Sequence, residues 1–128
     1  MSQWTHVAGC IRIDDLDSIM YGTSAMSRIA EAFKVYPLPE GSEGPIQVKI
    51  VETRKHEGAL SWGLAYIWGD LRDYDDEREI FAWAKEVCEQ LSVRQCAILV
   101  DVEFTARYII HGDGGDLTMT KLEDGDGD

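Results

Sequence analysis

The chain has 128 residues and a formal net charge of −12, from 24 acidic and 12 basic side chains. This length is typical of one domain, and the 45% share of hydrophobic residues excludes a disordered chain. Because the acidic excess repels phosphate backbones and anionic headgroups, we expect neither a nucleic acid nor a membrane as a direct partner.

The first third of the chain predicts a strand, a helix and a second strand. Residues 4–13 alternate as a strand and lead into an acidic turn. A helix is expected where apolar side chains recur at the spacing of one helical face, namely at Met26, Ile29, Ala30 and Phe33. Alternation at Ile46, Val48 and Ile50 predicts a strand with one buried face.

A third strand is predicted over residues 60–68. Its alternate positions are Leu60, Trp62, Leu64, Tyr66 and Trp68, and the positions between them are small or apolar. We therefore expect a central strand that is covered on both faces. An acidic loop over residues 70–75 follows it.

The last part of the chain predicts a helix, a strand and a hairpin. The helix covers residues 76–91, with Asp76 as its N-cap and Trp83 within its buried stripe. Residues 95–104 alternate as a strand, and residues 107–121 form the hairpin around a glycine-rich turn.

The order of these elements is βαββαβ, followed by an extra C-terminal strand or hairpin. It predicts an α+β fold, a ferredoxin-like sandwich with two helices on one face of a four- or five-stranded, mainly antiparallel sheet. Residues 1–122 form one domain in this interpretation, and the acidic tail 123–128 is disordered. The competing fold is another α+β sandwich with a different strand order.

The acidic residues suggest a candidate site. We expect the first and third strands to be parallel neighbours, which would bring three acidic loops to one edge of the sheet. The members of this predicted rim are Asp14, Asp15, Asp17, Asp70, Asp73, Asp75, Asp76, Asp113 and Asp116.

Three interpretations of the rim remain open. The acids are solvated loops that complement a helix N-terminus, or they imitate phosphates and bind a basic protein surface. The third interpretation is a Mg²⁺ or Mn²⁺ site, with Asp14 and Asp70 as the first-choice ligands.

Other residue types point to less specialised roles. The cysteines Cys10, Cys88 and Cys96 are far apart, so we expect buried free thiols in a reducing cytoplasm, without a disulfide or a zinc site. No catalytic or cofactor motif is complete, and no cofactor is expected. The aromatic stripe of Trp62, Tyr66 and Trp68 indicates core packing or a homodimer face, although it could also stack RNA bases.

The opening segment Trp4-Thr5-His6-Val7-Ala8-Gly9-Cys10-Ile11-Arg12-Ile13-Asp14 resembles the start of small uncharacterised phage and prophage proteins. The resemblance implies a class in which small acidic proteins inhibit host defence enzymes, some as DNA mimics. The expected function is a non-enzymatic acidic binding protein whose rim contacts a basic, nucleic-acid-binding host protein. The alternatives are a small metal-dependent phosphodiesterase or nuclease, and a small-ligand-binding or oligomer-forming protein that uses the aromatic stripe.

Overall fold

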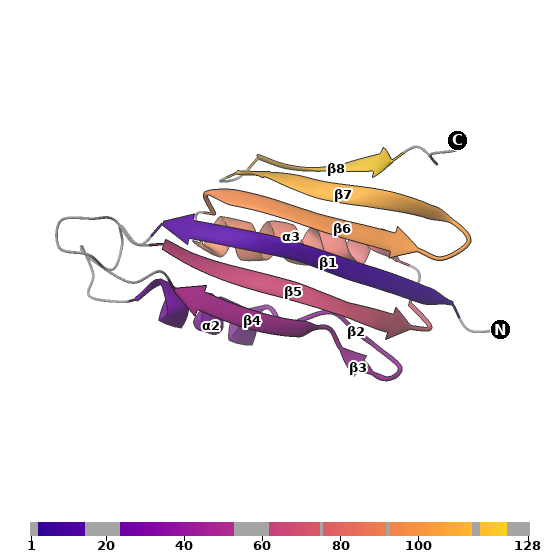
Figure 1. Cartoon of the computed structure of the whole chain (residues 1–128), viewed down its shortest axis with the longest axis horizontal. Helices are drawn as coiled ribbons and strands as arrows, with labels where there is room; N and C mark the ends of the chain where they lie inside the picture. Colours follow the sequence, from indigo (N-terminus) through magenta and orange to yellow (C-terminus); the bar gives the residue numbers. More distant parts are fainter. Residues whose placement is uncertain are drawn as a thin grey trace.

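The computed structural model describes residues 3–14, 24–52, 62–74, 76–91, 93–113 and 116–122. These residues form an α+β fold with a six-stranded sheet, in the order β4-β5-β1-β6-β7-β8, and two helices (Figure 1). The sheet strands are β1 (Trp4–Asp14), β4 (Gln47–Glu52), β5 (Trp62–Arg72), β6 (Gln95–Val102), β7 (Ala106–Asp113) and β8 (Asp116–Leu122). The helices are α2 (Ala25–Val35) and α3 (Glu77–Leu91), and a separate small hairpin joins β2 (Glu40–Gly41) to β3 (Gly44–Pro45).

Both helices lie on the same face of the sheet, as Figure 1 shows. Helix α2 packs behind β4 and β5, and α3 packs behind β6, β7 and β8. The prediction of two helices on one face is therefore confirmed, whereas the sheet has six strands rather than four or five. In the described part of the chain, neither helix has the length and apolarity needed to cross a membrane.

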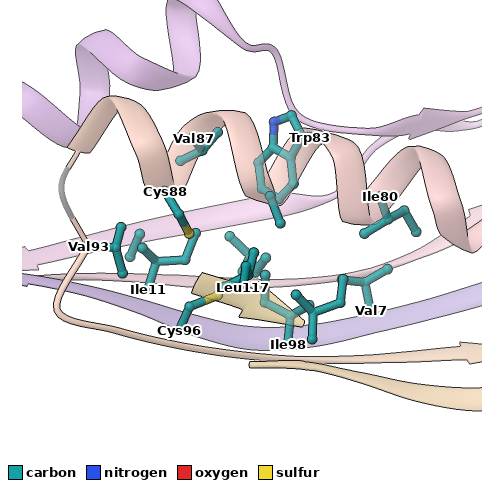
Figure 2. Packing of buried hydrophobic residues seen from close by; sticks show 14 of the residues in the cluster. Val7, Ile11, Ile80, Trp83, Val87, Cys88, Val93, Cys96, Ile98 and Leu117 are labelled. Atoms are coloured by element: carbon teal, nitrogen blue, oxygen red, sulfur yellow. The ribbon is translucent and has the colours of Figure 1, made fainter. Parts of the chain in front are cut away.

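The core lies between this helical layer and the sheet (Figure 2). Trp83 is 8% exposed, as its place in the predicted stripe requires. Its ring stacks on Phe33 with 5.9 Å between ring centroids, and its Nε1 donates a 2.9 Å hydrogen bond to the carbonyl oxygen of Tyr36. The indole thus joins α3 to α2 while it fills the space above the sheet.

The predicted parallel pairing of the first and third strands is wrong. β1 and β5 are neighbours at the sheet centre but run antiparallel, with Trp4 opposite Arg72 and Asp14 opposite Trp62. Helix α2 returns the chain so that β4 runs in the same direction as β1. β4 and β5 pair antiparallel as consecutive strands, so β5 runs back against β1. The C-terminal ends of β1 and β5 therefore lie at opposite ends of the sheet.

The buried face of α2 also differs from the predicted stripe. Ala25, Ile29 and Ala32 are buried, whereas Met26 is 44% exposed. Small side chains face the sheet because α2 approaches β5 closely at Gly63, where an added Cβ would lie 2.9 Å from the Cβ of Ala25. The helix is rotated so that Ala25 and Ile29, rather than Met26, make this contact.

The strand β5 extends beyond its predicted end. It continues to Arg72, so Asp70 lies within the strand and not in a loop. Tyr66 and Trp68 are 43% and 41% exposed, so the prediction that both faces of this strand are covered is also wrong. Asp76 caps α3 as expected, because its Oδ1 accepts a 3.1 Å hydrogen bond from the backbone N–H of Arg78. The tail 123–128 lies outside the described residues.

Candidate interaction surface

One face of the sheet is not covered by any described segment. In β1, Thr5, Val7 and Ile11 point toward the helices and are buried, so the residues between them point the other way. Paired residues on neighbouring strands share a face, which extends this alternation across the whole sheet. We call the side that points away from α2 and α3 the open sheet face, and Figure 1 looks directly onto it.

Two adjacent rows of side chains cross the middle of the open sheet face. Strand pairing places Trp68, Ala8, Leu99 and Ile109 in one row, and Tyr66, Cys10, Ala97 and His111 in the next. These two middle rows are apolar apart from His111 and the Tyr66 hydroxyl. Small side chains of β1 and β6 lie beside the large aromatic side chains of β5, so the surface formed by these two rows is lowest near its centre.

The large apolar residues exposed in the described part of the chain are concentrated on this face. Eight are at least 36% exposed, and five of the eight belong to the open sheet face: Val51, Tyr66, Trp68, Leu99 and Leu122. Scattered exposed apolar residues are normal, but clustered ones mark contact surfaces, and Tyr66 and Trp68 of β5 lie across β1 from Leu99 of β6. The open sheet face is therefore the strongest candidate site.

A histidine held by two carboxylates borders the middle rows at one end of β1. His6 Nδ1 lies 2.6 Å from Asp70 Oδ1, and its Nε2 lies 3.0 Å from Glu103 Oε2. The hydrogen bonds to Asp70 and then to Glu103 raise the pKa of His6 above its ordinary value, against the smaller opposing effect of desolvation. The His6 side chain thus joins β5, β1 and the turn after β6.

An arginine over an aromatic ring borders the rows at the other end. The guanidinium of Arg12 lies 4.5 Å from the centre of the Trp62 ring. Its Nε is buried and has no hydrogen-bond partner among the described residues, and the contact with the Trp62 ring offsets part of the cost of burying this charge. A shallow hollow of about 690 Å³ adjoins it, lined in part by Arg94, His111 and Asp116.

The structure divides the predicted acidic rim between the two ends of the sheet. Asp14, Asp113 and Asp116 lie at the end where Arg12 and Arg94 also lie, and Asp14 Oδ2 is 3.8 Å from Arg94 Nε. The opposite end carries Asp70, Asp73 and Asp76. Asp15, Asp17 and Asp75 are outside the described residues. A single rim formed by all three loops is therefore wrong, because β1 and β5 run antiparallel.

The proposed pair of metal ligands is separated by the same reversal. Asp70 pairs with His6, and Asp14 lies eight positions further along β1 than His6. At ~3.3 Å per residue this is ~26 Å, far beyond the reach of two carboxylates that share one cation. Within the described ranges, no group of three or more His, Cys, Asp or Glu side chains has an arrangement that could hold a metal ion.

Sequence reasoning identified the aromatic stripe of β5 but missed the rest of the open sheet face. Ala8, Cys10, Ala97 and Leu99 lie on β1 and β6 beside it. A signal was present in β6, where Leu99 is apolar although it alternates with the buried Ile98 and Val100. Such a residue indicates a contact surface where it lies near other exposed apolar residues, as Leu99 does in the row of Trp68.

The comparisons with known proteins provide no relative. No protein-family model matches the chain, and no match was found to a curated protein or to a solved structure. Any function therefore rests on the geometry and chemistry of the described residues.

Proposed function

We propose that this chain is a non-enzymatic protein-binding domain and that the open sheet face is its contact surface. The observation that carries this proposal is the set of large apolar side chains on β5 and β6, the two strands that flank β1, with Trp68, Tyr66 and Leu99 between 37% and 43% exposed. Aromatic residues at this degree of exposure supply large contact areas at low conformational cost, and they are enriched in protein interfaces. The charged groups around His6 and Arg12 form the polar border that such interfaces have.

The open sheet face is a better candidate than the acidic ends of the sheet. A phosphate-mimicking surface requires an excess of carboxylates, but Arg12 and Arg94 lie beside Asp14, Asp113 and Asp116. The described residues include 16 acidic and 10 basic side chains, which accounts for half of the net charge of −12. The other half belongs to residues outside the described ranges. The phage-inhibitor role that the N-terminal resemblance implies stays a prediction.

We infer that the fold is the ferredoxin-like βαββαβ plan, extended by the β7–β8 hairpin. The order β4-β5-β1-β6 within the sheet and the position of both helices on one face support this assignment. A two-layer plan of this kind leaves one sheet face without a helical cover, which makes that face available for contact.

A matched pair of double variants tests the proposed function. Trp68→Ser with Leu99→Ser removes two large apolar side chains from the open sheet face. Met26→Ser with Val35→Ser removes two similarly exposed ones from α2, which are 44% and 55% exposed. The wild type and both variants are immobilised as full chains and challenged with a lysate of the source organism, and association of the chain with itself is measured in parallel.

The expected result is that the Trp68/Leu99 variant binds ~10–100-fold more weakly in every saturable association, whereas the Met26/Val35 variant binds as the wild type does. A triple variant, Asp14→Asn with Asp113→Asn and Asp116→Asn, leaves every apolar residue of the face in place and should weaken association less than the loss of Trp68 and Leu99 does. The proposal is wrong if association survives loss of Trp68 and Leu99 but disappears in the Asp→Asn variant, since the acidic sheet end would then be the binding surface.

A further inference from the structure

We propose that the partner on the open sheet face is a second copy of this chain, so that two sheets pack face to face in a symmetric homodimer. This inference rests on the proposed function above and adds the identity of the partner. Three properties of the face favour its own copy over a basic protein: its charge balance, its area and its relief.

The charge of the open sheet face differs from that of the whole chain. Its strands present four basic side chains on this side, Arg12, Lys49, Arg72 and Arg107, and five acidic ones, Asp14, Asp70, Asp101, Asp113 and Asp116. The chain as a whole carries twice as many acidic as basic residues. A two-fold interface places the same patch on both subunits, so an excess of one sign would repel. A face with nearly equal numbers of acidic and basic side chains avoids this repulsion. A face that binds a basic partner would instead be expected to carry an excess of acidic side chains.

The dimensions of the face match those of a stable interface. Six strands spaced by ~4.8 Å, with about seven or eight paired residues at ~3.3 Å each, outline a plane of ~700 Å². A typical specific interface buries ~800 Å² on each partner. A second sheet of the same size therefore covers the face almost completely, including Trp68 on one side and Leu122 on the other.

The relief of the two middle rows also suits sheet-on-sheet packing. Sheets stack ~10 Å apart when side chains of both inner faces interdigitate. Small side chains at Ala8, Cys10 and Ala97 leave space in the centre, next to the large ones at Trp68 and Leu99. The large residues of one copy can therefore enter the low centre of the other.

Cys10 provides a native probe of this arrangement. It lies in one of the middle rows, on a strand at the sheet centre, and its side chain is partly exposed. Cys88 and Cys96 are buried on the helical side. In any two-fold dimer whose axis passes near the sheet centre, the two Cys10 side chains face each other across the ~10 Å gap between the sheets. A short bis-maleimide with a spacer of that order can then join them.

Sedimentation equilibrium of the purified full-length chain tests the inference. The wild type and the Met26→Ser/Val35→Ser variant should sediment at twice the 14.4 kDa of the chain. The Trp68→Ser/Leu99→Ser variant should dissociate ~10–100-fold more readily, since losing two central interface residues removes ~1–3 kcal/mol at ~1.4 kcal/mol per factor of ten. The bis-maleimide should cross-link the wild type into a covalent dimer but not Cys10→Ser. Circular dichroism confirms that each variant is folded.

Three results would overturn the inference. The wild type could sediment as a monomer at the highest soluble concentration. The dissociation constant of the dimer could stay at the wild-type value after loss of Trp68 and Leu99, or it could rise instead after loss of Met26 and Val35. If the wild type is monomeric but lysate proteins still bind through Trp68 and Leu99, the proposed function stands with a different partner. If no association depends on Trp68 and Leu99, both the dimer and the proposed function fail.

Discussion

The indole Nε1 of Trp83 donates a 2.9 Å hydrogen bond to the backbone carbonyl of Tyr36, the residue that follows α2. This contact joins the two helices above the sheet and satisfies the one polar atom of the largest side chain in the core. The indole of Trp83, which is 8% exposed, stabilises the fold both by packing and by this hydrogen bond. Substitutions at Trp83 can separate these two contributions to the free energy of unfolding.

Replacing Trp83 with Ala should lower the free energy of unfolding by ~3–5 kcal/mol, as for other buried large aromatic residues. Trp83→Phe should cost less, because it keeps the stacking on Phe33 and loses mainly the hydrogen bond to Tyr36, worth ~0.5–1.5 kcal/mol, and some volume. Urea denaturation at fixed pH measures both. A loss below ~1 kcal/mol for the Ala variant would contradict the role of Trp83 in the core.

His6 should make folding stability depend on pH. Its pKa is raised in the folded state by Asp70 and Glu103, so its contribution is complete below the unfolded value of about 6.5 and is lost as pH rises through the folded pKa. The difference in unfolding free energy between wild type and His6→Gln should therefore be larger at acidic than at alkaline pH. It should not exceed the ~1 kcal/mol typical of solvent-exposed ion pairs.

His111→Gln is the control for this experiment, because the Nε2 of that imidazole lies within hydrogen-bond distance of the hydroxyl oxygens of Thr120 and Thr118, at 3.3 and 3.4 Å. If the His6→Gln difference is independent of pH, or grows toward alkaline pH, the two carboxylates do not stabilise the imidazolium.

Gly112 should resist substitution more strongly than Gly44. Both have positive φ angles, +147° and +111°, so alanine is strained at either position by ~1–3 kcal/mol. At Gly112 an added Cβ would also lie 2.2 Å from the carbonyl oxygen of Asp116, whereas nothing lies within 4 Å at Gly44. Thermal unfolding should show a clearly greater loss for Gly112→Ala. Equal losses would mean that β8 can move away from β7 at little cost.

The contact of Arg12 with Trp62 should be measurable as a coupling energy. A double-mutant cycle with Arg12→Gln and Trp62→Leu is expected to give ~0.5–1 kcal/mol, the range for cation–π contacts near a surface. The coupling should persist at high salt better than that of an exposed ion pair. A coupling energy of zero would show that the guanidinium does not depend on the ring.

The three cysteines should differ in reactivity. Cys88 and Cys96 are 1% and 2% exposed, and the pKa of Cys96 is raised by its hydrogen bond with Cys88 and by burial. A disulfide reagent should therefore modify only Cys10 in the folded Trp68→Ser/Leu99→Ser variant, and all three thiols after unfolding. Rapid modification of more than one thiol in the folded protein would show that α3 opens from β6.

The local elements of this protein could be predicted from its sequence, because their signals are local. The pattern of residues 4–13 predicted β1, and the spacing of apolar residues around Trp83 predicted α3. The glycine-rich turn that begins at Gly112 predicted the hairpin of β7 and β8. The position of Trp83 in the core also followed from the helical period. In each case the residues that form the pattern lie within a few positions of one another in the sequence.

Two properties were decided only by the tertiary structure. The direction of β5 relative to β1 depends on pairing between residues that lie about sixty positions apart, and it determines whether Asp14 and Asp70 meet. Whether a face of the sheet is covered depends on where the helices pack, and this could not be predicted from β5 alone. The prediction that Tyr66 and Trp68 are covered was wrong for this reason. Period-two alternation separates the two faces of a strand, but it contains no information about which layers pack on them. Strand direction and the open sheet face therefore arise from long-range packing.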